Sequence, residues 1–163
     1  MAFKEPIEKY SNSVVEVDIS GVKVGGQSVL TGLYTFDGPV PNPPKIAMEV
    51  LDTQPEEWPQ PLISALGDVY GDPVKWALKC QNEYKADMIC LSLLSADPNG
   101  LNRSAEEVAK TAKAVLDAIN IPLIVYGCLN SEKDGEVMKA VQEACHGKVI
   151  LVGPADDENY KQI

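Results

Sequence analysis

The sequence predicts an α/β protein built on a parallel β-sheet. From Lys45 onward, short apolar segments alternate with longer segments in which apolar residues recur at helical spacing. The apolar segments are nearly continuous, which is typical of parallel strands that are covered on both faces. Strands and helices that alternate in this way form right-handed crossovers and a parallel sheet. The predicted strands cover residues 46–51, 88–94, 123–126 and 149–152, and the predicted helices cover residues 73–84, 105–119 and 135–145.

A β-hairpin is predicted ahead of this region. Residues 14–19 and 22–24 are rich in β-branched side chains, and Ser20-Gly21 forms the turn between them. The proline-rich segment 37–44 follows and cannot be helical, because proline fixes the backbone and removes a hydrogen-bond donor. We therefore expect two regions, which are residues 1–44 with the hairpin and the proline-rich lead-in, and residues 45–163 with the β/α units.

Two of the predicted helices have clear start signals. Ser104 precedes the helix 105–119 and Glu107 follows three residues later, which is the pattern of a capping box. Within this helix, Val108, Ala112 and Val115 lie on one face. Asp72-Pro73 supplies a cap and a first-turn proline to the helix that begins at residue 73.

The number of units favours a TIM-type (β/α)8 barrel. A complete barrel takes about 250 residues, so the four units of residues 45–163 correspond to its first half. The chain ends where a further helix should begin, which we interpret as the mark of a fragment or of a sheet completed by something else. An open, flavodoxin-like sheet is the alternative, but no G-x-G-x-x-G sequence or other phosphate-binding glycine loop follows any predicted strand.

The charge balance excludes some classes of partner. The 14 basic and 24 acidic residues give a net charge of -10, which repels nucleic-acid phosphates and anionic lipids. No apolar run approaches the roughly 20 residues of a membrane span, and residues 1–6 show no secretory signal. We expect a cytoplasmic protein that binds neither nucleic acid nor membranes.

The cysteine pattern predicts no iron–sulfur cluster within the chain. Cys80, Cys90, Cys128 and Cys145 are widely spaced, and no C-x-x-C pair occurs. Cys90 and Cys145 occupy positions typical of buried apolar fillers, whereas Cys128 follows a strand, where side chains face a cleft. The single histidine, His146, lies far from Cys128 in sequence and does not support a Cys/His nucleophilic pair.

Polar residues follow each predicted strand, at the edge where parallel folds place their ligand sites. Carboxylates and amides at this edge suit a planar, polar heterocycle. For Asp52 the competing interpretation is a solvated strand end, for Asp97 and Asn99 a tight turn, and for Asn130 a helix cap. No strand end carries a metal-ligand cluster or a Ser/His/Asp set, so we predict no catalytic and no metal residues. The candidate ligand-binding residues are Asp52, Asp97, Asn99, Tyr126 and Asn130.

Several motifs, in order along the chain, resemble one family. They closely resemble the small subunit of the corrinoid iron–sulfur protein, which is also called the delta subunit of acetyl-CoA decarbonylase/synthase. The similarity runs through essentially the whole chain and covers about the N-terminal half of that subunit. The motifs are PNPPKIAMEV at 41–50, PEEWP at 55–59, DPVKWA at 72–77, SADPNG at 95–100 and PLIVYGC at 122–128.

The resemblance implies a TIM barrel that pairs with a larger subunit carrying a four-iron cluster and a cobalamin domain. In this family the barrel sits beneath the corrinoid. The pair carries methyl groups from methyltetrahydrofolate and its methyltransferase to acetyl-CoA synthase, in the reductive acetyl-CoA (Wood–Ljungdahl) pathway. The chain is then a non-catalytic scaffold that shares the cobalamin with its partner. The alternative is a pterin-binding methyltransferase, because Asp97 and Asn99 fall in places comparable to the pterin ligands of such barrels.

Overall fold

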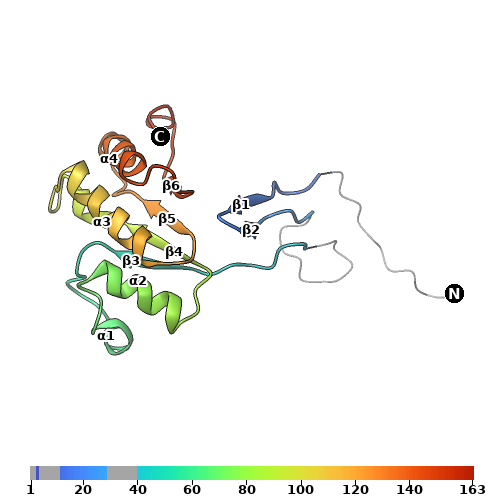
Figure 1. Ribbon diagram of the computed structural model, residues 1–163, viewed down its shortest axis with the longest axis horizontal. Coiled ribbons are helices and arrows are strands. Elements are labelled where there is room, and N and C mark those ends of the chain that lie inside the picture. Colours follow the sequence, from blue (N-terminus) through green and yellow to red (C-terminus); the bar gives the residue numbers. More distant parts are fainter. Residues whose placement is uncertain (1–2, 4–11, 29–39) are drawn as a thin grey trace. The chain divides into compact units, whose positions relative to one another are not determined.

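The computed structural model describes residue 3 and residues 12–28 and 40–163 of the chain. The chain divides into two compact units, Met1–Lys45 and Ile46–Ile163. Both units are drawn in Figure 1.

The first unit contains the predicted hairpin. Strands β1 (Val17–Ile19) and β2 (Val22–Val24) pair in antiparallel fashion. Ser20 and Gly21 both have positive φ angles, of 49° and 90°, as a two-residue hairpin turn requires. The amide of Gly21 donates a 2.6 Å hydrogen bond to Asp18 Oδ1, which fixes the turn. The hairpin is therefore confirmed, although β1 is shorter than the predicted strand.

The proline-rich lead-in is described only in part. Residues 37–39 of the predicted segment lie outside the described residues, as do residues 1–2 and 4–6 at the amino terminus. Residues 40–44 form neither helix nor strand, as the prolines predict.

The second unit is built on a four-stranded parallel sheet. Its strands are β3 (Ala47–Leu51), β4 (Met88–Ser92), β5 (Leu123–Tyr126) and β6 (Leu151–Gly153), and they follow one another in chain order. The parallel sheet predicted from the sequence is confirmed. A flavodoxin-like sheet reverses its strand order at a switch point, whereas these four strands run in one direction without a reversal.

Some element boundaries differ from the predicted ones. β4 ends at Ser92 rather than at residue 94, because the chain turns into the short 3-10 helix η1 (Leu94–Ala96). A short helix, α1, precedes α2 and was not predicted from the sequence. The α-helices are α1 (Gln60–Leu66), α2 (Pro73–Asn82), α3 (Ala105–Ala118) and α4 (Ser131–Ala144).

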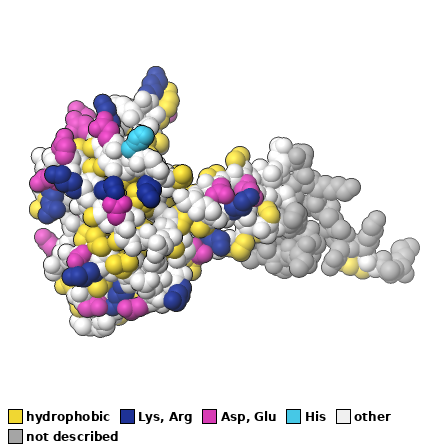
Figure 2. Space-filling model, in the orientation of Figure 1, with side chains coloured by type: hydrophobic (Ala, Val, Ile, Leu, Met, Phe, Trp, Pro, Cys, Tyr) yellow, Lys and Arg dark blue, Asp and Glu magenta, His cyan; other side chains and the backbone are white. Residues whose placement is uncertain are grey.

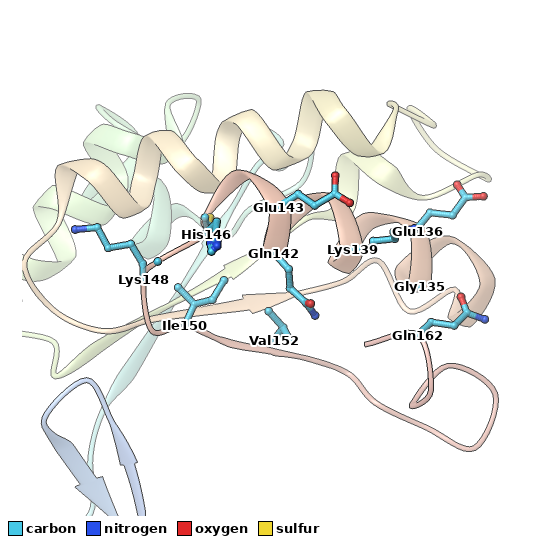
Figure 3. A pocket seen from close by; sticks show the side chains of 12 residues that line it. Gly135, Glu136, Lys139, Gln142, Glu143, His146, Lys148, Ile150, Val152 and Gln162 are labelled. Atoms are coloured by element: carbon cyan, nitrogen blue, oxygen red, sulfur yellow. The ribbon is translucent and has the colours of Figure 1, made fainter.

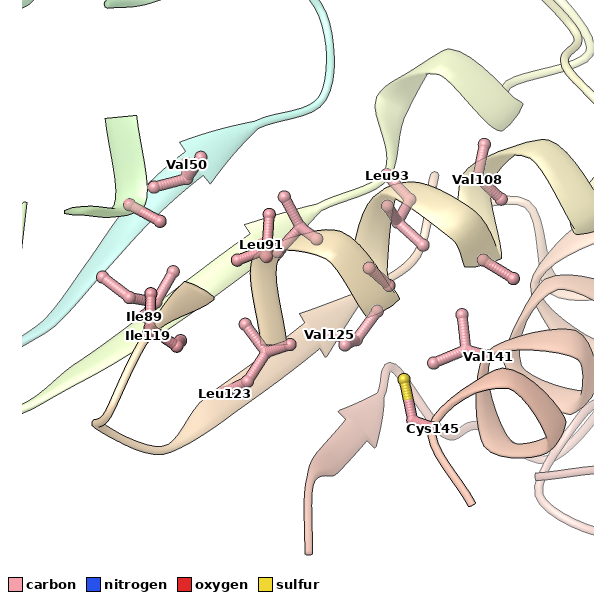
Figure 4. Packing of buried hydrophobic residues seen from close by; sticks show 14 of the residues in the cluster. Val50, Ile89, Leu91, Leu93, Val108, Ile119, Leu123, Val125, Val141 and Cys145 are labelled. Carbon is pink, nitrogen blue, oxygen red and sulfur yellow. The ribbon is translucent and has the colours of Figure 1, made fainter. Parts of the chain in front are cut away.

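All four helices contribute to a single hydrophobic cluster on one face of the sheet. Leu91 and Val125 in the strands pack there with Trp76 of α2, Val108 of α3 and Val141 of α4, and all of these side chains are buried. Figure 4 shows the strand side chains pointing toward α3 and α4. Near α1, Trp58 stacks on Tyr70 and meets Trp76 edge to face, with ring centroids 5.9 Å and 5.2 Å apart. Burial of this apolar surface supplies most of the stability of the unit.

The opposite face of the sheet carries no helix within the second unit. Cross-strand neighbours Glu49, Cys90, Ile124 and Leu151 lie on this face, and each is exposed or half-buried. The expectation that both faces are covered is therefore wrong for residues 46–163. Burial alternates in β3, as in Glu49 against Val50, whereas β4 keeps the nearly continuous burial expected from its apolar sequence.

Candidate functional site

The candidate site lies at the carboxyl ends of the parallel strands, where all five predicted residues are found. Asp52 follows β3, Tyr126 ends β5, and Asn130 precedes α4. Asp97 and Asn99 follow η1, which comes directly after β4. The structure thus brings the five residues to one edge of the sheet, but the hydrogen-bond partners of their side chains differ.

Asp52 is a buried carboxylate that joins two loops. Its Oδ1 accepts a 2.9 Å hydrogen bond from the amide of Ser95, and its Oδ2 accepts a further bond from the Ser95 hydroxyl. Burial raises the pKa of Asp52, and the two Ser95 hydrogen bonds and the charge of Arg103 partly offset this effect. The arrangement ties the loop after β3 to η1.

Asp97 and Asn99 form a turn with each other. Asp97 Oδ1 accepts hydrogen bonds from the Asn99 amide at 2.9 Å and from Asn99 Nδ2 at 3.3 Å. The carbonyl of Asp97 also accepts from the amides of Gly100 and Asn102. These bonds have the pattern of an Asx turn, in which a carboxylate satisfies the backbone two residues on.

Asn130 caps helix α4. Its Oδ1 accepts a 3.0 Å hydrogen bond from the amide of Lys133. This cap starts the helix at Ser131 rather than at the predicted residue 135.

Asp134, in the first turn of α4, is fully buried and was not predicted from the sequence. Its carboxylate accepts hydrogen bonds from the amides of Cys128 and Leu129, at 2.7 Å and 3.1 Å. A Cβ at Gly127 would overlap this carboxylate, so the glycine makes the arrangement possible. The loop from β5 into α4 is thus fixed by one acidic side chain. The signal in the sequence that could have identified Asp134 is an acidic residue in the first turn of a helix, together with a glycine, Gly127, at the end of the preceding strand.

Tyr126 belongs to a polar group on the helix-free face. It lies beside Ser92 in the sheet register, and Ser92 Oγ donates a 2.7 Å hydrogen bond to Glu49 Oε1. Cys90 neighbours Glu49 on the same face, where burial and then the Glu49 charge raise the pKa of its thiol. Glu49 and Ser92 were not among the predicted residues. The alternation of side chains along β3 and β4 was the signal that could have placed them on one face.

The four cysteines are all free. Cys145 is buried in the core, as predicted, but Cys90 is half-buried and lies on the helix-free face instead. Cys128 does not face a cleft, since it is buried at the end of β5, and burial raises its pKa to about 11. No group of three or more potential metal-ligating side chains occurs among residues 3, 12–28 and 40–163.

A groove lies along helix α4. It has a volume of about 1070 Å³ and runs between α4 and the segment that leads into β6. Figure 3 shows Gln142 of α4 above Ile150 and Val152. Charged side chains such as Lys139 and Glu143 form its rim.

The surface shows no segregation of charge on the side visible in Figure 2. Acidic and basic side chains are interspersed over the second unit, with small hydrophobic patches between them. Within the described part of the chain, no helix has the length and apolar character needed to span a membrane.

The fold and the site together define the class of protein. The chain is an α/β protein of repeated β/α units, with its helices on one face of a parallel sheet and its strand-end polar groups engaged in local structure. Residues 15–163 match the family described as the CO dehydrogenase/acetyl-CoA synthase delta subunit. The chain belongs to this family, which confirms the resemblance seen in its motifs.

Three relatives illustrate the match, and each is named acetyl-CoA decarbonylase/synthase complex subunit delta. The protein from Methanocaldococcus jannaschii is 34% identical over 172 residues, which are 99% of this chain and 42% of the relative. The protein from Methanothermobacter thermautotrophicus is 34% identical over 167 residues, with the same coverage. The protein from Archaeoglobus fulgidus is 34% identical over 96% of this chain and 37% of the relative. The chain therefore spans about two fifths of the length of these relatives.

Proposed function

We propose that the chain is a non-catalytic scaffold in a methyl-transfer complex. It supports the cobalamin-bearing large subunit of a corrinoid iron–sulfur protein. That complex receives methyl groups from methyltetrahydrofolate and its methyltransferase and delivers them to acetyl-CoA synthase, in the reductive acetyl-CoA pathway. Membership of the delta-subunit family and the names of the relatives support this assignment.

The scaffold has the form of a TIM-type barrel, of which residues 46–163 supply the first four β/α units. Strands in chain order with every helix on one face match the barrel pattern, in which helices form an outer ring and the other face lines the interior. An open doubly wound sheet would carry helices on both faces.

One observation carries the non-catalytic assignment. Of the five candidate ligand-binding side chains, four already serve the local backbone or one another. Asp52 binds Ser95, Asp97 binds Asn99, and Asn130 binds the Lys133 amide. A ligand would have to displace these contacts, and at Asp52 it would leave the buried amide of Ser95 unpaired.

The cobalamin is held by the partner subunit in this proposal. The sequence contains one histidine, and His146 follows α4, at the amino end of the sheet and away from the candidate site. The strand-end residues therefore offer no imidazole to a cobalt ion. This chain instead contacts the partner and the edge of the corrinoid through its carboxyl-end loops.

The net charge of the chain limits the classes of partner that it can bind. A net charge of -10 disfavours nucleic acid and anionic membranes as partners. A cytoplasmic location is a separate part of the proposal.

The test is binding to the purified corrinoid-bearing large subunit under anaerobic conditions. In gel filtration, we expect the corrinoid absorbance to shift to a larger species when the chain is added. Leu101→Glu changes an exposed residue in the loop after β4, and we expect it to weaken the complex. Leu62→Glu changes an exposed residue on the outer helix α1 and is the matched control. Absence of a shift at high concentration of both proteins contradicts the proposal.

The alternative is a methyltransferase that binds a pterin directly through Asp97 and Asn99. Their position at the carboxyl end of the sheet favours it, because pterin-like heterocycles bind at such edges. Saturable pterin binding by the isolated chain separates the two functions.

A further inference from the structure

The loop that follows β5 holds a leucine in an unfavourable backbone conformation. Leu129 has a φ angle of 67°, in the left-handed region that glycine and asparagine tolerate best. Its side chain is 70% exposed, so it contributes little to the buried core. A glycine would suit this backbone better, and a polar side chain would suit the solvent better. The position therefore combines backbone strain with an exposed apolar side chain.

The surrounding structure holds the strained backbone in place. The amides of Cys128 and Leu129 donate hydrogen bonds to the buried carboxylate of Asp134, at 2.7 Å and 3.1 Å. The lack of a side chain at Gly127 leaves room for that carboxylate. Strained backbone persists where its surroundings determine it in this way, and it is concentrated at functional sites. The loop thus presents the Leu129 side chain to the solvent in a fixed position.

Other exposed apolar side chains lie at the same end of the sheet. Leu94 is 38% exposed and Leu101 is 62% exposed, and both lie between β4 and α3. Tyr126, the last residue of β5, is 37% exposed. Because β4 and β5 are the two central strands, with a neighbouring strand on each side, this exposure does not arise at an outer edge of the sheet. We call Leu94, Leu101, Tyr126 and Leu129 the apolar rim.

The loops around the apolar rim are predominantly acidic. Residues 93–104, 127–133 and 154–163, which follow β4, β5 and β6, contain five acidic and three basic residues. Asp156 lies near the Leu129 loop, because its carboxylate accepts a 2.6 Å hydrogen bond from the hydroxyl of Ser131. A second copy of the chain would bring like charges together across this surface, which disfavours it as the partner. A surface with basic groups around an apolar centre is complementary.

We propose that Leu129 is the central anchor of an interface with a protein partner, whose surface presents an apolar pocket bordered by lysine and arginine side chains. The identity of this partner as the corrinoid-bearing large subunit rests on the proposed function. An apolar anchor that fills a pocket at the centre of an interface carries much of the binding free energy. Because Asp134 already fixes the loop, the partner does not have to order it on binding. The strain at Leu129 is then a loss of stability that is retained because it serves binding.

The proposal predicts that stability and binding respond in opposite directions at this position. Leu129→Gly relieves the left-handed strain, so the midpoint of urea unfolding should stay equal or rise. The same variant removes the anchor, so its affinity for the purified large subunit should fall at least about tenfold. Leu129→Met keeps an apolar side chain of similar size and should bind within about threefold of the wild type.

The matched control is Lys85→Gly. Lys85 also has a left-handed φ angle, of 57°, but it precedes β4 and so lies at the opposite end of the sheet. Lys85→Gly should therefore relieve similar strain and leave the affinity for the large subunit unchanged. The association rate of the wild-type chain should fall as salt is added, because the acidic loops face basic groups. A rate that does not depend on salt overturns the basic partner surface.

The outcomes separate this inference from the proposed function. Equal affinity of the wild type and Leu129→Gly for the large subunit overturns the inference alone. A lower urea midpoint for Leu129→Gly also overturns it, because the leucine would then serve the fold rather than binding. Failure of the wild-type chain to bind the large subunit at high concentration overturns the proposed function and this inference together.

Discussion

Replacing Asp134 by alanine is the most informative single perturbation of the candidate site. The carboxylate accepts two backbone hydrogen bonds and is fully buried. Its loss leaves two amides without a hydrogen-bond partner. The amide of Cys128 is buried, and the amide of Leu129 is partly buried. Each unpaired amide costs about 1–3 kcal/mol, so we expect a loss of about 2–4 kcal/mol in the free energy of unfolding. This is a large share of the roughly 5–15 kcal/mol that is typical of a folded domain.

Urea unfolding followed by circular dichroism measures the effect, with a shift in midpoint at constant slope. Asp134→Asn keeps one acceptor oxygen and should cost less than Asp134→Ala. Glu136→Ala changes an exposed acidic residue on the same helix and should stay within about 0.5 kcal/mol of the wild type. Equal stabilities for Asp134→Ala and Glu136→Ala would refute the idea that this carboxylate fixes the loop.

Three further predictions concern stability. Gly127→Ala should cost at least about 2 kcal/mol in urea unfolding, because its Cβ would overlap the Asp134 carboxylate, and a neutral effect would contradict this packing. Ser104→Ala removes the capping box of α3 and should cost about 1 kcal/mol, seen as a lower Tm, whereas an unchanged Tm would show that the cap is dispensable. Burial raises the pKa of Asp52 in the folded chain. At pH values between its unfolded-state and folded-state pKa, the folded chain therefore binds more protons than the unfolded chain, and the stability that this carboxyl contributes falls as pH rises through that window. Asp52→Asn lacks this loss, so its free energy of unfolding in urea should rise relative to that of the wild type between about pH 3 and about pH 7. A difference between the two proteins that stays constant over this range would contradict the raised pKa.

The fold was largely predictable because hydrophobic spacing determines it. The apolar runs of the strands and the capping residues before α2 and α3 specify elements directly. The end of β4 was mispredicted because Leu93 and Leu94 continue the apolar run, and tertiary contacts turn the chain into η1 instead. Helix α1 was missed because prolines at residues 59 and 61 obscure a short helix.

The exposed sheet face could not be read from composition. Ile124 and Leu151 are as apolar as the core residues, so their side of the sheet is distinguishable only when the register is known. Strand-end positions were predictable from topology alone, and Asp52 and Asn130 do lie there. Their hydrogen-bond partners were not predictable in the case of Asp52, because Ser95 lies 43 residues away in sequence.

The scaffold assignment is tested most directly by equilibrium dialysis of the isolated chain against labelled methyltetrahydrofolate. If the strand-end groups serve local structure, the chain alone should show no saturable binding of the pterin, and Asp97→Ala should give the same result as the wild type. Saturable binding by the wild-type chain that is lost on Asp97→Ala, with both proteins equally folded, would contradict the scaffold assignment. That outcome would establish a pterin site at the carboxyl ends of the strands.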